Sequence, residues 1–192
     1  MVPAATQVVR HRHVEPRLHN ESNIMGYSTH FAGEFLVTPT LEPAHIEYLK
    51  KFNETRRMKR DEKIAETLPD PVREAVGLPV GEQGAYFVGG VGFMGQESDA
   101  STKDYNCSPT EQPGLWCQWV PTDDGDSIVW DEGEKFYEYV EWIEYLIEHF
   151  LGPWGYKLNG SVEWEGDERG DLGLIVIKDN EVDVKYGRIV YD

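Results

Sequence analysis

Apolar and polar residues alternate through residues 26–38. In an extended chain Phe31, Phe35 and Val37 project from one face, and His30 and Glu34 project from the other. This alternation predicts a half-buried strand.

The next segment, residues 40–57, has helical periodicity instead, and Thr40 is the predicted N-cap. Its apolar arc comprises Leu41, His45, Tyr48, Leu49 and Phe52. Because His45 lies in this arc, we expect it to be a hydrogen-bonded core residue rather than a ligand.

Several later segments are β-prone and are joined by short turns. Residues 115–132 indicate a hairpin with Asp124-Gly125 at its turn. Three more strands are predicted at 160–166, 172–178 and 182–191, with Asp179-Asn180 joining the last two. Residues 85–93 predict a short strand followed by a glycine-rich turn, and residues 95–114 predict a loop.

The order of these elements predicts an α+β fold. Because the links are short, we expect two layers: a mainly antiparallel sheet of about five to seven strands, with two main helices on one face. Residues 25–192 are expected to form a single domain, in which 57–114 is an irregular excursion. Residues 1–24 have no periodicity and are expected to be a flexible tail, with Met25 as a candidate natural start.

The second helix is predicted to span residues 132–151, with Asp131 and Glu134 as a capping box and Gly152-Pro153 as the stop. On a helical wheel its predicted core arc comprises Phe136, Tyr139, Val140, Ile143, Leu146, Ile147, Phe150 and Leu151. The remaining arc holds five glutamates. Glu134–Glu138 and Glu144–Glu148 are like-charged i,i+4 pairs, each of which costs roughly 0.2–0.5 kcal/mol.

Three interpretations of this acidic face remain open. It is a solvated surface, or it is neutralised internally by the basic cluster Arg56–Arg60, or it binds a basic partner. The third predicts that Trp142, Tyr145 and Tyr137 are exposed beside the acid, and its candidate binding residues are Glu138, Glu141, Glu144, Glu148, Trp142 and Tyr145. A stricter version, mimicry of duplex DNA, needs one charge per ~1.7 Å, and therefore needs residues 123–126 and 163–171 beside the helix.

The net charge of −17 limits the classes of molecule that this protein is expected to bind. Residues 81–192 carry seven Lys or Arg against 24 Asp or Glu, which disfavours direct binding of nucleic acid and of anionic membranes. No apolar run approaches the ~20 residues of a membrane span, and no secretory signal is evident. Cys107 and Cys117 form no C-x-x-C motif, which favours a reducing cytoplasm, and Cys117 is expected to be a buried, inert thiol.

The best case for an enzyme is the polar face of the first strand. His30 and Glu34, with Gln118 or with Glu163 and Glu165 on neighbouring strands, would suit a metal-dependent hydrolase or a nucleotide-processing enzyme. The ordinary interpretation is a solvated sheet face. No nucleotide-binding, nucleophile or metal motif is present, so we expect no cofactor and no resident metal.

Three motifs carry a resemblance to a known family: W-C-x-W at 116–119, the aromatic helix, and L-N-G-x-V-x-W-x-G at 158–166. From Met25 to Asn180 the chain resembles a family of small uncharacterised proteins common in bacteriophages and bacterial genomes. The resemblance implies a phage or prophage setting and assigns no catalytic residue.

Together these features predict a non-enzymatic acidic protein, located in the cytoplasm of a bacterial host, that binds a basic host factor as an inhibitor or nucleic-acid mimic. The alternatives are the His/Glu enzyme and a virion or assembly component, and homo-oligomer formation would favour the latter.

Overall fold

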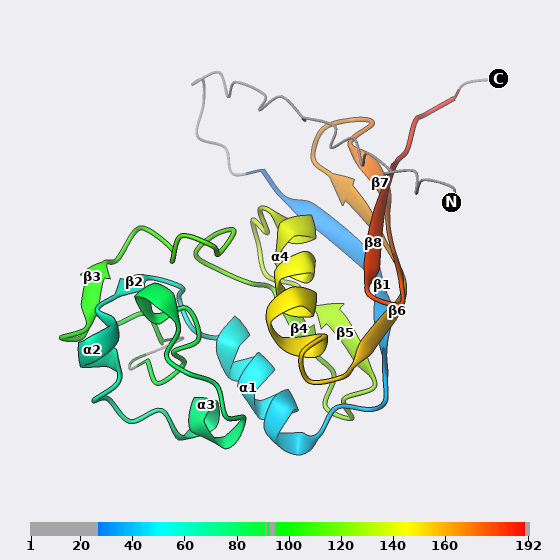
Figure 1. The fold of residues 1–192 in the computed structure, drawn as a ribbon. Helices are drawn as coiled ribbons and strands as arrows, with labels where there is room; N and C mark the ends of the chain where they lie inside the picture. Colours follow the sequence, from blue (N-terminus) through cyan, green and yellow to red (C-terminus); the bar gives the residue numbers. More distant parts are fainter. Residues whose placement is uncertain (1–26, 91, 93–94, 191–192) are drawn as a thin grey trace, which may run out of the picture.

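The structure is a computed structural model that describes residues 27–90, 92 and 95–190; the predicted tail, residues 1–24, lies outside this range. Figure 1 shows the elements, which in chain order are β1 (Thr29–Thr38), α1 (Pro43–Asn53), β2 (Lys59–Arg60), α2 (Glu62–Ala65), α3 (Pro71–Ala75), the 3-10 turn η1 (Glu82–Gly84), β3 (Thr102–Asp104), β4 (Trp119–Pro121), β5 (Ser127–Trp130), α4 (Tyr139–Leu146), the π-helical turn η3 (Ile147–Leu151), β6 (Lys157–Gly166), β7 (Leu172–Lys178) and β8 (Glu181–Tyr186).

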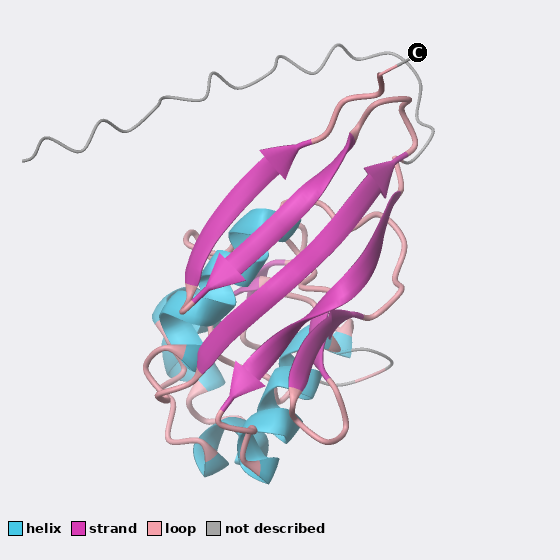
Figure 2. Ribbon diagram, turned by 90° about the vertical axis from the view of Figure 1, so that its right-hand side faces the viewer, coloured by secondary structure: helices cyan, strands magenta, loops and turns pink. Residues whose placement is uncertain are grey.

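The main sheet has six strands in the order β4-β5-β1-β6-β7-β8, and every neighbouring pair is antiparallel. The long helices α1 and α4 lie on one face of it, and Figure 2 shows the other face with the helices behind. The predicted α+β architecture is therefore confirmed. In the described part of the chain, no helix is long and apolar enough to span a bilayer.

The alternation in the first strand reflects its place in the centre of the sheet. β1 pairs with β6 over ten residues, from Thr29 opposite Gly166 to Thr38 opposite Lys157. Phe35 and Val37 are buried beneath the helices, while His30 and Glu34 are exposed on the opposite face.

Both hairpins expected from turn chemistry are present. Gly125 has φ +75° in the β4–β5 turn, and Asp179 and Asn180 have φ 49° and 72° between β7 and β8. These left-handed conformations match the twist of the flanking strands, which is why Asn, Asp and Gly mark such turns.

The N-termini of both long helices differ from the predictions. α1 begins at Pro43 after the N-cap residue Glu42, and the Thr40 hydroxyl donates to Asp126 at 2.5 Å instead of capping the helix. α4 begins at Tyr139 rather than near residue 132. Glu132, Lys135 and Glu138 all have positive φ, which a right-handed helix excludes.

The segment 57–114 is less irregular than predicted. It contains β2, α2, α3, η1 and β3, although residues 85–90 do not form the predicted strand. It also buries three arginines, of which Arg57 donates to the carbonyls of Ala85 (2.8 Å) and Phe87 (3.1 Å) and lies 4.1 Å from the centroid of Phe52. The hydrogen bonds tie the start of the segment to the residues after η1, and the contact with Phe52 packs it against α1.

Cys117 is buried, as predicted, and burial raises the pKa of its thiol to about 12. A thiol with so high a pKa is almost entirely protonated at neutral pH and is a poor nucleophile. Both Cys107 and Cys117 are free.

Candidate functional site

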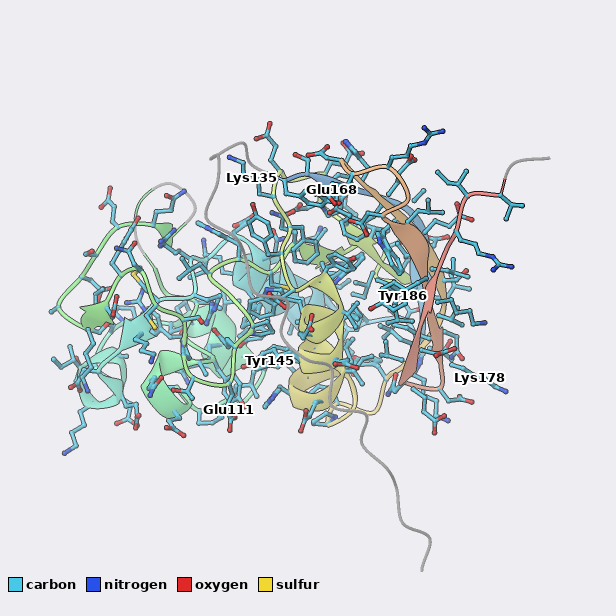
Figure 3. All side chains as sticks on the ribbon, turned by 90° about the horizontal axis from the view of Figure 1, so that it is seen from above. Glu111, Lys135, Tyr145, Glu168, Lys178 and Tyr186 are labelled. Carbon is cyan, nitrogen blue, oxygen red and sulfur yellow. The ribbon has the colours of Figure 1, made fainter. Side chains whose placement is uncertain are left out.

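Four glutamates converge on a hollow between α4 and the loop around residue 111. This groove has a volume of 320 Å³ and is lined by Glu111, Pro113, Glu141, Glu144, Tyr145, Glu148 and His149. We call it the acidic groove. Figure 3 labels Glu111 on the 57–114 segment and Tyr145 on the neighbouring side of α4.

Helical spacing explains three of its four carboxylates. Glu141 and Glu144 of α4 and Glu148 of η3 are three and four residues apart, so they form one exposed stripe along these two consecutive elements. Glu111 reaches the same groove from a segment 30 residues earlier in the chain. Sequence reasoning missed Glu111 because its place beside α4 depends on how the 57–114 segment folds back.

Buried contacts hold the wall of the groove in place. The Gln112 amide donates to the Tyr145 hydroxyl at 3.0 Å and to the Ala85 carbonyl at 2.6 Å. The Tyr145 ring stacks on His149 with centroids 4.1 Å apart, and His149 Nδ1 lies 3.0 Å from the Tyr86 hydroxyl. The groove is therefore a fixed feature rather than a set of independent surface side chains.

The carboxylates in the groove repel one another. Burial raises the pKa of the Glu144 carboxyl, and the charges of Glu141 and Glu148 raise it further. Within the described residues, none of the four groove glutamates has an ion pair with a Lys, Arg or His side chain at 4.0 Å or less. The groove is thus a region of uncompensated negative charge.

This repulsion gives a testable pH dependence. A raised pKa means that the folded state binds the Glu144 proton more tightly than the unfolded state does. Ionisation of Glu144 therefore lowers the free energy of unfolding above the folded-state pKa, and this loss disappears as the pH falls below that pKa. Glu144→Gln should therefore increase the free energy of unfolding at pH 7 by up to ~0.5 kcal/mol, with the gain vanishing at acidic pH. Urea unfolding at several pH values measures it.

The matched control for this change is Glu47→Gln on α1. Glu47 is exposed and precedes Lys50 and Lys51 by one turn, so removal of its charge should give no gain at pH 7. Equal gains for the two variants, or a Glu144→Gln gain that persists in acid, would show that the groove carboxylates do not interact as described.

Two of the six predicted binding residues lie elsewhere than expected. Trp142 is 0 % exposed and Tyr145 is 5 % exposed, so the prediction that they project into solvent as aromatic anchors is wrong. Both rings pack against Phe52 of α1, with centroid distances of 6.1 Å and 6.2 Å. The reason is that α4 is covered on two sides, by the sheet and by α1 with the 57–114 segment.

The other four predicted residues are exposed, but they do not act as one set. Glu141, Glu144 and Glu148 line the acidic groove. Glu138 precedes α4 with φ 53° and, with Glu141, lines a separate hollow of 250 Å³ beside Val184 and Tyr186 of β8. Their exposure suits both the solvated-surface and the basic-partner interpretations.

The arginines of the basic cluster Arg56–Arg60 do not neutralise the acidic face of α4. Arg56 donates to the Tyr105 carbonyl and the Asn106 side chain, Arg57 donates to backbone carbonyls, and Arg60 pairs with Asp99 at 2.6 Å. This interpretation of the acidic face is therefore wrong.

The three acidic segments needed for DNA mimicry do not lie together. The end of β1 meets the 123–126 turn, where Leu41 N donates to the Gly125 carbonyl. The start of β1 lies beside residues 166–171, because Thr29 pairs with Gly166. A ten-residue strand is about 30 Å long, so these segments are at opposite ends of the sheet.

The polar sheet face brings together only part of the predicted enzyme site. His30 lies opposite Glu165, and a depression of 670 Å³ there is lined by His30, Glu163, Glu165 and Lys185, among others. Glu34 lies opposite Ser161, and four residues along a strand separate it from His30 by about 13 Å, too far to share a metal or a proton.

The remaining enzyme candidates give no metal site either. Gln118 is buried, accepting from Trp130 Nε1 at 3.0 Å and donating to the Glu134 carbonyl at 2.9 Å. Among the described residues, no group of three His, Cys, Asp or Glu side chains is arranged to hold a metal ion. The polar sheet face therefore offers a weaker case for function than the acidic groove.

Comparison with known proteins adds no assignment, and the resemblance to a phage family remains an expectation. The chain matches no protein-family model, and no curated protein or solved structure is significantly similar to it.

Proposed function

We propose that this protein is a non-enzymatic interaction protein whose acidic groove binds a basic protein partner, in the expected setting a host factor that it inhibits. The observation that carries the proposal is the convergence of Glu111 with Glu141, Glu144 and Glu148 on one groove that holds no paired cation in the described part of the chain.

Convergence distinguishes this groove from an ordinary solvated helix face. A stripe on one helix needs no explanation, because charged residues commonly face water. A fourth carboxylate from a distant segment adds repulsion without stabilising the fold. A Lys or Arg side chain from a partner would relieve that repulsion and would form charge-assisted hydrogen bonds with the groove.

The groove also has the surface that an arginine side chain prefers. The His149 and Pro113 rings line the groove beside the carboxylates. Arginine guanidinium groups stack on such rings while they pair with carboxylates. We therefore favour an arginine-rich segment over a lysine-rich one.

The test is capture of partners from a bacterial lysate with three tagged proteins: wild type, Glu144→Lys and Glu47→Lys. The two variants change the net charge equally, and both substituted residues are exposed on helices. We expect a basic protein that wild type and Glu47→Lys retain at low salt, that high salt releases, and that Glu144→Lys binds about tenfold more weakly or not at all.

Direct titration of the captured protein against each variant then gives the affinities. Equal binding by all three proteins, or binding that is indifferent to salt, would remove the acidic groove as the docking surface.

A further inference from the structure

The two edges of the six-stranded sheet are protected unequally. At one edge, β4 is only three residues long and ends in Pro121, which has no N–H to offer a further strand. At the other edge, on the left in Figure 2, β8 is six residues long and contains no proline. Long unprotected edges invite pairing with another chain.

The register identifies which backbone groups of β8 face outward. Gly187 N donates to its register partner, the Leu172 carbonyl, so the odd-numbered residues of β8 bond to β7. The N–H and C=O groups of Val182, Val184 and Tyr186 therefore point to the open edge. Among the described residues, none of these groups has a backbone partner outside β8 and β7.

The side chains of β8 are complementary to themselves in one register. An antiparallel copy must pair outward-facing residues with one another, and placing Val184 opposite Val184 of the second copy satisfies this. Asp183 of each copy then lies opposite Lys185 of the other copy, so the pairing contains two such ion pairs. Val182 lies opposite Tyr186, and β-branched and aromatic residues pair well across strands.

The neighbouring registers are each opposed by like charges. A shift of one step along the open edge in either direction places Asp183 opposite Asp183 or Lys185 opposite Lys185. A two-step shift toward the start of β8 places Asp183 opposite Glu181. Like charges directly opposite each other destabilise a strand pair. The opposite two-step shift, centred on Tyr186, has no such contact but places only Tyr186 of β8 opposite a β8 residue. The Val184-centred register is therefore the longest one that is free of like-charge contacts.

The helix side of β8 has room for the side chains of a second copy. Tyr186 is 83 % exposed although it lies beside the buried Trp164, and Figure 3 shows it between β8 and α4. The adjoining hollow of 250 Å³ is lined by Tyr139, Val140 and Val184 and by the carboxylates of Glu138 and Glu141. An added strand would cover the exposed Tyr186 ring and the apolar part of this hollow.

We propose that two copies of this chain associate by antiparallel β8–β8 pairing centred on Val184, which joins their sheets into one continuous sheet. The proposal rests on β8 and not on the acidic groove, although Glu141 lines both the groove and the 250 Å³ hollow. The net charge of −17 on each copy opposes association at low salt, so the measurement belongs near 150 mM salt, where the screening length is about 8 Å.

The test is charge exchange across the pair, read by sedimentation equilibrium over a range of chain concentrations. Wild type is expected to dimerise. Asp183→Lys and Lys185→Asp should each weaken the dimer at least about tenfold, because each places like charges opposite one another at two positions. The exchange Asp183→Lys/Lys185→Asp restores both pairs and should return the affinity to within about threefold of wild type.

Two further comparisons separate pairing from misfolding. Glu47→Lys, which changes the net charge as Asp183→Lys does, should leave the dimer intact. Tyr186→Pro removes an outward N–H but no bond to β7, and should weaken the dimer more than Tyr186→Ser, with both variants folded by circular dichroism. A wild-type chain that stays monomeric to roughly 100 µM, or a dimer that the exchange fails to restore, would overturn the proposal.

Discussion

Trp142→Ala is expected to lower the free energy of unfolding by about 3–5 kcal/mol, the usual cost of truncating a large buried aromatic side chain. Trp142 is 0 % exposed, and its ring lies against Phe52 and Tyr145, so the deletion leaves a cavity between α1 and α4 that neither helix can close alone. Urea unfolding followed by circular dichroism measures the loss.

Tyr137→Ala is the matched control, because Tyr137 is an aromatic residue just before α4 that is 54 % exposed. Its truncation should change stability by no more than about 0.5 kcal/mol. A Trp142→Ala protein as stable as the Tyr137→Ala protein would mean that Trp142 faces solvent, and it would restore the aromatic docking surface that the buried ring excludes.

Asp70→Ala should cost a similar amount, about 3–5 kcal/mol, because it leaves a buried positive charge without its partner. The Asp70 carboxylate is 1 % exposed and accepts from Arg73 Nε at 3.0 Å and from Val88 N at 3.0 Å. Thermal and urea unfolding both report the change. Arg73→Ala combined with Asp70→Ala should cost less than the sum of the two single changes, since the double variant has no orphaned charge.

Glu74→Ala removes the other carboxylate near Arg73 and serves as the comparison. Glu74 Oε1 lies 3.6 Å from Arg73 Nη2, and the Glu74 side chain is 62 % exposed, so water screens the pair and its loss should cost less than about 1 kcal/mol. If Asp70→Ala and Glu74→Ala lowered the free energy of unfolding by the same small amount, the stability of the 57–114 segment would not depend on the buried Asp70–Arg73 ion pair.

The strands of the six-stranded sheet were predictable because their signals are local, whereas β2 and β3 were not predicted and residues 85–90 do not form the predicted strand. Alternation in residues 29–38 and the turn residues Gly125, Asp179 and Asn180 depend only on neighbours in the chain, and the structure places them as the pattern requires. The start of α4 was not predictable in the same way. Phe136 continues the helical wheel, yet it is buried from a loop in which Lys135 has φ 60°.

The acidic groove was only half predictable. The stripe of Glu141, Glu144 and Glu148 follows from helical spacing, but Glu111 joins it through the path of a segment that has little periodicity. The same path explains the error at Trp142 and Tyr145. A helical wheel identifies one apolar arc, and it cannot show that α1 and the 57–114 segment cover a second side of the helix.

The sequence by itself determined the class of fold, the central strand, both hairpins, the large negative charge and the inert character of Cys117, because each depends on composition or on residues close together in the chain. Tertiary structure decided which aromatic rings are buried, which carboxylates share a groove and which edge of the sheet stays open. Those outcomes depend on contacts between segments tens of residues apart, and the free energy of such contacts leaves no local pattern to read.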